Sequence, residues 1–187
     1  SNPVIFTGSQ RSPDRPSSDA HLNLEGAAKA AMSDLGEISI AMHETTDDLN
    51  VAIWRGNRTR KNHSSKRDAF TSLNDEPIGI VSEKIEWKGK YRPTCEKTVI
   101  KSGFDEKIAL VWAHPGFNSG DWENVTSSKK GVVIAGTGLG HINSNLLESI
   151  GKTAKDMPVA MSTQCLAGTT NLNVYRNGRK LIEKGVV

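Results

Sequence analysis

At 187 residues, the chain is long enough to bury a hydrophobic core in one or two compact units. Its 36% hydrophobic and 24% charged residues are typical of a globular protein and exclude an intrinsically disordered one. No apolar run approaches the ~20 residues of a membrane-spanning helix, and a net charge of +3 does not by itself indicate a nucleic-acid partner.

A strand, a helix and a second strand are predicted at the start of the chain. Residues 3–8 form a short apolar run that is typical of a buried strand, and a polar loop follows it. Serines and an aspartate at 17–19 favour a helix N-cap, and apolar residues then recur at helical spacing as far as Gly36. Residues 38–43 form the next apolar run. This order, with short connections, predicts a parallel pair of strands.

The middle of the chain predicts three more strands and a connector. Residues 51–54 form an apolar run that is followed by a strongly basic loop. Two later segments, 78–85 and 87–91, are predicted to be strands joined by a tight turn. Beyond them the pattern is weak and charged, which is typical of a connector between two compact units.

The second half of the chain repeats this pattern. Strands are predicted at 108–113, 132–135 and 158–162, and helices at 143–155 and 176–184. The sequence therefore predicts an α/β fold of two units, 1–85 and 108–187, joined by a linker, 86–107. Parallel sheets flanked by helices are expected in both units.

The two cysteines, Cys95 and Cys165, lie far apart and have no metal-ligand spacing around them. Neither a disulfide framework nor a metal site is therefore expected. A cytoplasmic location is expected instead. Cys165 follows a predicted strand with no base close to it in sequence, which favours a small buried thiol over a nucleophile. Thr46 beside Asp47 resembles an activated threonine, but turn-forming residues follow, so a turn explains the pair at least as well.

The densest polar cluster is the loop at residues 7–19, in which arginines, aspartates, serines and prolines lie close together. It follows a predicted strand, and ligands bind open α/β sheets at the carboxyl ends of strands. The alternative is a well-capped connection whose Arg and Asp side chains pair with each other. The sequence leaves both interpretations open.

A second cluster, residues 55–67, holds six Lys or Arg residues and no carboxylate. One interpretation is electrostatic binding of the phosphates of tRNA or a nucleotide, although no aromatic side chains are interleaved to stack on bases. Another is that crowded positive charge lets one lysine lose its proton more easily and act as a base. The alternative is a solvated basic loop, the commoner fate of such runs.

Gly136-Thr-Gly-Leu-Gly140-His141 follows a predicted strand and precedes a helix, so a phosphate cradle has to be considered. The segment lacks the spacing of a dinucleotide site and the Lys-Ser/Thr of a P-loop. A tight turn is therefore favoured. His141 is a candidate ligand contact in that turn, although a single histidine is more often structural.

Taken in order, these segments resemble the asparaginase family of amidohydrolases. The resemblance rests on Thr7-Gly8-Ser9-Gln10-Arg11 with Asp19-Ala-His-Leu-Asn23-Leu24, on Arg58-Thr-Arg60-Lys61 with Phe70, on Ile134-Ala-Gly136-Thr-Gly-Leu-Gly140-His141, and on Ser162-Thr-Gln-Cys165. Other details, such as Asn171-Leu-Asn173-Val-Tyr175, resemble one branch, the glutaminase (D-type) components of archaeal glutamyl-tRNA(Gln) amidotransferases. The resemblance implies a two-lobe α/β fold, in which 1–85 is the C-terminal part of the first lobe and 108–187 the smaller second lobe.

The resemblance also implies roles for three residues. In this family a threonine attacks an amide to form an acyl-enzyme, and a second threonine, an aspartate and a lysine transfer protons. The matching lysine is Lys61. The backbone carbonyl of Ser9 matches the group that holds the leaving amide nitrogen, and His141 matches a position that reaches a neighbouring subunit's site.

The sequence departs from the family at the nucleophile. The family's two threonines lie in Thr-Gly-Gly-Thr and Thr-Asp-Thr elements, and neither element occurs in residues 1–187. In the family both elements precede the strand with which this chain begins. We therefore expect the N-terminal part of the first lobe to be missing and the isolated chain to be inactive. The second lobe could likewise lack residues at its C-terminal end.

The branch implies a glutaminase component that releases ammonia from glutamine. A partner subunit would use this ammonia, with ATP and Mg²⁺, to convert Glu-tRNA(Gln) to Gln-tRNA(Gln), and no cofactor is implied for this chain. A homodimer within a heterotetramer is expected, contacting tRNA through the complex and no membrane. The alternatives are a free-standing asparaginase or glutaminase, acting on asparagine or glutamine alone, and a non-catalytic module of the same fold.

Overall fold

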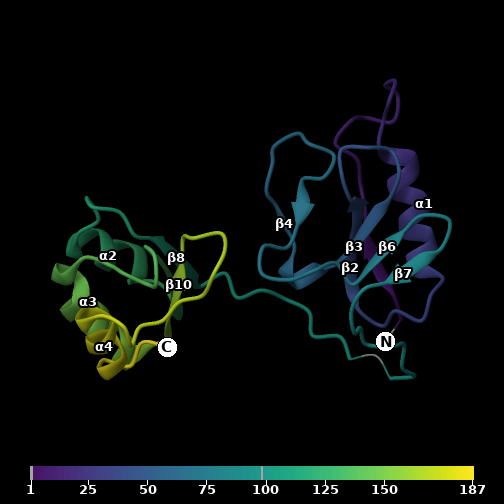
Figure 1. Cartoon of the computed structure of the whole chain (residues 1–187). Helices are drawn as coiled ribbons and strands as arrows, with labels where there is room; N and C mark the ends of the chain where they lie inside the picture. Colours follow the sequence, from purple (N-terminus) through teal and green to yellow (C-terminus); the bar gives the residue numbers. More distant parts are fainter. Residues whose placement is uncertain (1, 98) are drawn as a thin grey trace. The chain divides into compact units, whose positions relative to one another are not determined.

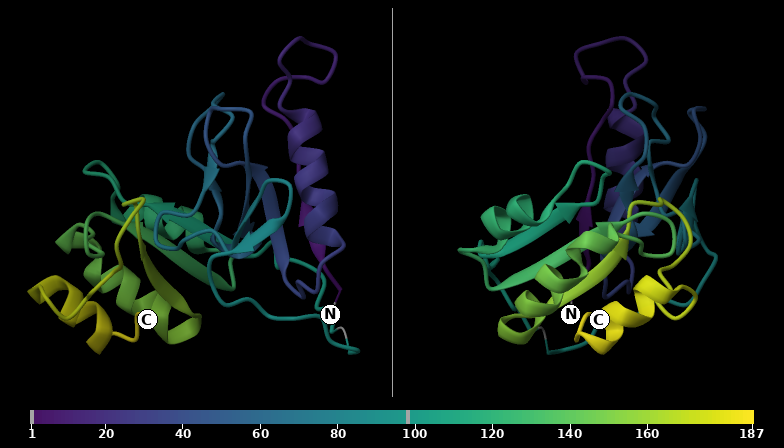
Figure 2. Two further views of the ribbon diagram at one scale, coloured as in Figure 1. Left: turned by 45° about the vertical axis from the view of Figure 1, so that its right-hand side comes forward. Right: turned by 90° about the vertical axis from the view of Figure 1, so that its left-hand side faces the viewer.

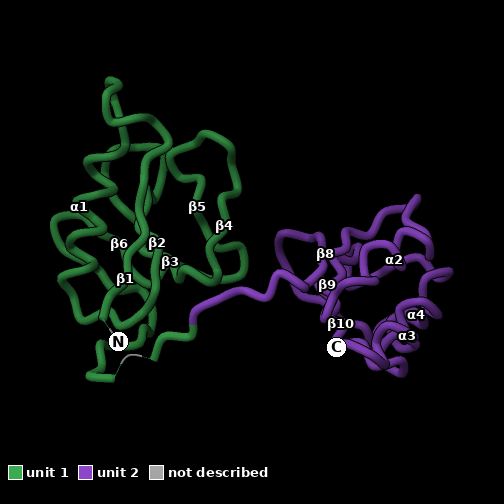
Figure 3. The backbone as a smooth tube through the Cα atoms, turned by 180° about the vertical axis from the view of Figure 1, so that it is seen from behind, with its two compact units in different colours: residues 1–101 green, residues 102–187 purple. Residues whose placement is uncertain are grey.

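The computed structural model describes residues 2–97 and 99–187, which belong to two compact units, 1–101 and 102–187 (Figures 1 and 3). Both units combine sheets with helices, so the predicted α/β class is confirmed. Among the described residues, no helix is long and apolar enough to cross a membrane.

The first unit is built on a five-stranded sheet with the strand order β1-β2-β3-β6-β7. Its elements are β1 (Val4–Phe6), α1 (Ala20–Ala31), β2 (Ile38–His43), β3 (Val51–Arg55), the 3-10 helix η1 (Gly56–Arg58), β4 (Arg60–Lys61), β5 (Phe70–Thr71), β6 (Gly79–Val81) and β7 (Ile85–Trp87). Strands β4 and β5 pair with each other in a separate two-stranded sheet.

The pairing in the first unit is mixed. Strands β1 and β2 are parallel, as their connection through α1 predicts. The other neighbours, β2–β3, β3–β6 and β6–β7, are antiparallel, so the expectation of a parallel sheet holds for one pair only. The connections 44–50 and 82–84 are too short to cross over the sheet and return a strand in parallel. The segment 78–85, which was predicted to be one strand, contains a turn at 82–84 and so contributes to two strands, β6 and β7.

Helix α1 runs beside β1 and β2 (Figure 2). The core beneath it consists of small and branched side chains, namely Ala27, Ala30, Leu35, Ala41, Val51, Ile53, Ile78 and Val81. The close approach requires Gly26, because a Cβ atom there would lie 2.7 Å from the Cβ of Val51. This packing fixes α1 against the strands whose ends form the candidate site.

The first unit extends into the segment expected to be the linker, 86–107. Trp87 ends β7, and its ring lies 4.2 Å from that of Tyr91. The Tyr91 hydroxyl donates to Asp34, and Thr94 N–H donates to the Asp34 carbonyl. The segment therefore follows the first unit as far as Thr94, held by contacts that its weak apolar pattern does not reveal.

The second unit has a three-stranded parallel sheet, β10-β9-β8, as predicted. Its elements are β8 (Ile108–Trp112), α2 (Ser119–Thr126), β9 (Gly131–Gly136), the 3-10 helix η2 (Ser144–Leu146), α3 (Leu147–Asp156), β10 (Val159–Thr163) and α4 (Arg176–Glu183). Helix α2 was not predicted. It begins at a capping box in which Asn118 and Asp121 bond each other's backbone N–H groups.

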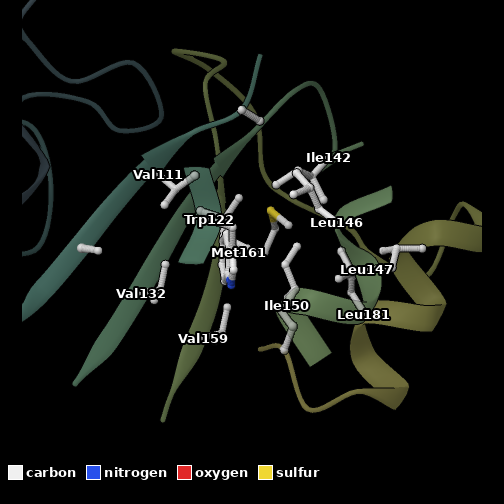
Figure 4. Packing of buried hydrophobic residues seen from close by; sticks show 14 residues of the cluster. Val111, Trp122, Val132, Ile142, Leu146, Leu147, Ile150, Val159, Met161 and Leu181 are labelled. Carbon is white, nitrogen blue, oxygen red and sulfur yellow. The ribbon is translucent and has the colours of Figure 1, made fainter. Parts of the chain in front are cut away.

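The core of the second unit lies between the sheet and its helices (Figure 4). Trp122 is its largest fully buried side chain, and the indole N–H donates to Thr153 Oγ1 at 2.8 Å. Alternate residues of β8 face away from this core, so Ile108, Leu110 and Trp112 are about half exposed or more. One face of the sheet thus carries the apolar packing of this unit.

Candidate active site

A cavity of about 200 Å³ opens where the parallel strands β1 and β2 end. It is lined by Phe6, Thr7, Gly8, Ser9, Gln10, Ile40, Met42, Lys61 and Phe70. The carboxyl ends of parallel strands are where α/β sheets bind ligands. Its volume is below the roughly 300–1,000 Å³ of pockets that hold drug-sized molecules, so it suits a small polar group.

Lys61 enters this cavity from the hairpin of β4 and β5. Its Nζ donates a hydrogen bond to Gln10 Oε1 at 2.8 Å and lies 5.7 Å from the centre of the Phe70 ring. Phe70 is the residue paired with Lys61 across the hairpin. The backbone N–H of Asn62 donates to the Ala69 carbonyl, which closes the hairpin behind the lysine. The ammonium group is therefore directed by an amide and an aromatic face.

Ser9 also lines the cavity, in a loop whose backbone is fixed on both sides of it. The Asn23 side-chain amide donates to the Gly8 carbonyl at 2.9 Å. The Gln10 N–H donates to the Asp19 carboxylate at 2.9 Å, and the Arg11 N–H donates to the same carboxylate at 2.9 Å. Because Gly8 and Gln10 are both held, the Ser9 carbonyl between them is held in position as well. The structure thus brings Lys61 and Ser9 to one cavity.

Contrary to the expectation from the sequence, the Asp19 side chain does not cap helix α1 but bonds the loop before the helix. Ser18 Oγ accepts the hydrogen bond from Ala20 N–H at the helix start, while the fully buried Asp19 carboxylate turns back to the loop. Burial favours its neutral form, but the N–H groups of Gln10, Arg11 and Asp19 itself outweigh this and lower the pKa of Asp19 below its ordinary value of 3.8. The carboxylate therefore stays charged and keeps the loop folded around the cavity.

Gln10 and Asp19 lie in the polar loop predicted as a candidate ligand site, but neither was assigned a role in the site from the sequence. Gln10 lies 51 positions from Lys61, and nothing local to either residue shows that they meet. A signal for Asp19 does exist, because Asp19 and Asn23 are four residues apart and so share one face of α1. In the described part of the loop, no salt bridge joins Arg11 or Arg15 to an aspartate of the loop, so the self-paired alternative is not what the structure has.

His141 belongs to the second unit, whereas the residues that line the lysine cavity belong to the first. It follows the tight turn favoured for the glycine-rich segment, in which Gly138 and Gly140 have φ angles of 52° and 110°. Its N–H donates to the Thr137 carbonyl at 2.8 Å, and its ring lies 4.5 Å from that of Tyr175. With His114 and Asn143 it lines a separate cavity of about 210 Å³.

Two weaker candidates are resolved by their surroundings. Thr46 and Asp47 are exposed in the turn between β2 and β3, and neither lines the lysine cavity. The prediction that Cys165 is buried is wrong, because its side chain is exposed. The chain leaves the sheet after Thr163, whose hydroxyl accepts the Cys165 N–H, and this bend turns the cysteine outward. Within 2–97 and 99–187, no group of three or more His, Cys, Asp or Glu side chains could hold a metal ion.

Comparisons with known proteins match both halves of the chain. Residues 1–93 match the family model "Asparaginase, N-terminal", and residues 107–187 match "Glutaminase/Asparaginase C-terminal domain". The chain is 44% identical over 191 residues to the D component of the Pyrococcus furiosus glutamyl-tRNA(Gln) amidotransferase, covering 99% of this chain and 44% of that protein. The same component of the Thermoplasma acidophilum enzyme is 41% identical over 186 residues, covering 99% and 46%.

A solved structure is similar throughout the chain. The thermostable L-asparaginase from Thermococcus kodakarensis matches with a TM-score of 0.90 and 31% identity, covering 100% of this chain and 56% of that protein. The chain spans less than half the length of the two amidotransferase components. From the two matching family models and the shared fold, the chain belongs to the asparaginase family.

Proposed function

We propose that this chain is part of the glutaminase component of a tRNA-dependent amidotransferase, which hydrolyses glutamine to supply ammonia. The observation that carries the proposal is the lysine cavity, in which Lys61 and the fixed Ser9 backbone line the same small space. The similarity to the D components of archaeal amidotransferases over 99% of the chain supports the choice of branch.

The chemistry assigned to the cavity is proton transfer during amide hydrolysis. A hydroxyl attacks the amide carbon, the carbon–nitrogen bond breaks, and the hydroxyl proton ends on the departing nitrogen as ammonia leaves. Water then breaks the ester that remains, which releases glutamate and restores the hydroxyl. Lys61 in its neutral form takes that proton and passes it on. The Ser9 carbonyl accepts a hydrogen bond from the amide nitrogen and so orients the group that leaves.

The hydroxyl itself is proposed to come from outside residues 1–187. Neither threonine element of the family occurs in this sequence, and the chain spans only 44–46% of the two related amidotransferase components. The isolated chain is therefore expected to be inactive. The alternative of a non-catalytic module predicts that activity stays absent in the protein from the intact gene.

The wider assembly is part of the proposal. A partner subunit uses the ammonia together with ATP and Mg²⁺ to convert Glu-tRNA(Gln) to Gln-tRNA(Gln), while this chain holds no cofactor of its own. A homodimer of the glutaminase within a heterotetramer, located in the cytoplasm, is the arrangement we propose. His141 is proposed to reach a neighbouring subunit's site, and its partly exposed side chain is accessible for such a contact.

The second candidate, a free-standing L-asparaginase, is favoured by the similarity to the Thermococcus kodakarensis asparaginase at a TM-score of 0.90. The two are separated by measuring ammonia release from glutamine and from asparagine by the protein of the intact gene. Glutamine hydrolysis that rises on adding the partner subunit and Glu-tRNA(Gln) supports the amidotransferase. Unassisted turnover of asparagine, unchanged by both additions, would instead establish the asparaginase.

A further inference from the structure

We infer that His43 is a positioning residue for the lysine cavity, an inference that rests on the proposed function. It holds together the two walls of the cavity, namely the loop that contains Ser9 and the basic loop that contains Lys61. His43 is the last residue of β2 and is fully buried, yet it does not line the cavity. One ring nitrogen contacts the network that fixes the Ser9 loop. The other contacts the network that anchors the basic loop bearing Lys61.

The first connection runs from His43 to the Ser9 loop through Asn23. The Asn23 amide nitrogen donates to the Gly8 carbonyl at 2.9 Å and to Asp19 Oδ2 at 3.1 Å, and both of these groups can only accept. Asn23 Oδ1 must therefore be the acceptor toward His43, whose Nδ1 lies 2.6 Å away and donates to it. The histidine thereby sets which way the Asn23 amide points and keeps its donor on Gly8.

The second connection runs from His43 to the basic loop through Asp48. His43 Nε2 lies 3.2 Å from Asp48 Oδ1, and it donates to this oxygen when it carries a proton in addition to the one on Nδ1. The same oxygen accepts from Arg67 Nη1 at 2.6 Å. Arg67 also donates to the Ser17 carbonyl. Ser17 has a φ of 57°, a left-handed conformation that is rare for a residue with a side chain. Arg67 thus ties the basic loop both to the turn that follows β2 and to the loop that precedes α1.

The two connections meet at the imidazole ring. A buried polar side chain costs free energy unless its hydrogen bonds are made, and this ring has a fixed partner on each side. Removing either bond is expected to release one wall while leaving the other in place. Lys61 and Ser9 would then lose their relative positions, and small errors in position cost large factors in rate.

Two substitutions separate the connections in the protein of the intact gene. His43→Asn places a donor near Nδ1 and keeps the bond to Asn23, whereas His43→Gln places a polar atom near Nε2 and keeps the bond to Asp48. His21→Asn, an exposed histidine of α1, is the matched control. We expect kcat for ammonia release to fall about 10- to 100-fold in His43→Gln, with KM within about twofold. His43→Asn should be less affected, and the control unchanged.

Hydrogen exchange provides a readout that does not depend on activity. The N–H groups of Gln10 and Arg11 are bonded to Asp19, so His43→Gln should speed their exchange while that of the β9 backbone stays unchanged. Normal kcat and normal exchange in a folded His43→Gln protein would overturn the positioning role. If that variant does not fold, Asp48→Ala decides, because it removes the oxygen that His43 and Arg67 share, and the Asp48 side chain is 62% exposed. Here too an unchanged kcat overturns the role.

Failure of the positioning role and failure of the proposed function are distinguishable. A protein that releases no ammonia, or that releases it without Lys61, contradicts the proposed function. Loss of Gln10 and Arg11 protection in His43→Gln would still support the positioning role. Conversely, an essential Lys61 together with fully active His43 variants would leave the function standing and remove the role of His43.

Discussion

The two units of the molecule bury different kinds of side chain. In the described part of the first unit, the buried groups include Asp19, Asn23 and His43, which bond one another across α1 and β2. The second unit has an almost wholly apolar core, where the buried Thr126 hydroxyl simply returns to the Trp122 carbonyl of its own helix. Buried polar networks stabilise less than apolar packing but fix geometry more tightly.

This contrast indicates how the work is divided between the units. The lysine cavity and the buried polar network behind it belong to the first unit, where the relative positions of Lys61 and Ser9 matter for the proposed catalysis. The second unit gains its stability from a continuous apolar cluster beneath a parallel sheet. Substitutions in the two units should therefore differ in whether they affect stability or catalysis.

The largest stability effect is expected from Trp122→Ala in the second unit. Removing this fully buried ring leaves a cavity and takes away the indole N–H that donates to Thr153 Oγ1, so the free energy of unfolding should fall by about 3–5 kcal/mol. Chemical denaturation measures it, with Trp112→Ala as the matched control, because Trp112 is 53% exposed. Equal losses in the two variants would show that the buried cluster is not what stabilises this unit.

A smaller stability loss, combined with a loss of activity, is expected from Asp19→Ala in the first unit. The N–H groups of Gln10 and Arg11 lose their acceptor, which costs about 1–3 kcal/mol. Ammonia release per folded molecule should also fall, unlike in Trp122→Ala. The control is Asp14→Ala, an exposed carboxylate of the same loop. If Asp19→Ala keeps full activity, the loop does not need this carboxylate.

The smallest effect is expected in the pH dependence of stability. Hydrogen bonds from His43 and then Arg67 lower the pKa of Asp48 below its ordinary value of 3.8, and the pKa of Asp19 is also lowered. Depressed carboxyl pKa values stabilise the fold above the ordinary value, and this contribution is lost as pH falls through the folded values. Denaturation midpoints below about pH 4 should therefore change less steeply in Asp48→Asn. The same change of midpoint with pH in Asp48→Asn and in the unaltered protein would show that ionised Asp48 does not stabilise the fold.

Elements with strong apolar periodicity were predictable, and contacts distant in sequence were not. The run 38–43 matches β2, and the helix predicted at 176–184 matches α4 within a residue. Helix α2 was missed because Trp122 and Thr126 are its only buried residues among those described, so no apolar face is visible. Its Asn118–Asp121 capping box was the available signal.

The candidate site was predictable in part for the same reason. The family pattern names Lys61 and Ser9, and the structure places both at one cavity. Gln10 lies in the predicted polar loop, but nothing local shows that it bonds Lys61. His43, a single histidine at a strand end, has no local pattern that marks it. Cys165 was misjudged because the end of β10 could not be located closely enough to show which way its side chain points.

The most direct test of the central claim is the rate of ammonia release from glutamine by Lys61→Met in the protein of the intact gene. Lys66→Met removes the same charge from the same loop, and Lys66 is not among the residues that line the cavity. We predict that Lys61→Met lowers kcat by about 10²–10⁴-fold while folding and assembly persist, and that Lys66→Met leaves the rate unchanged. A Lys61→Met protein as active as the unaltered one would contradict the account.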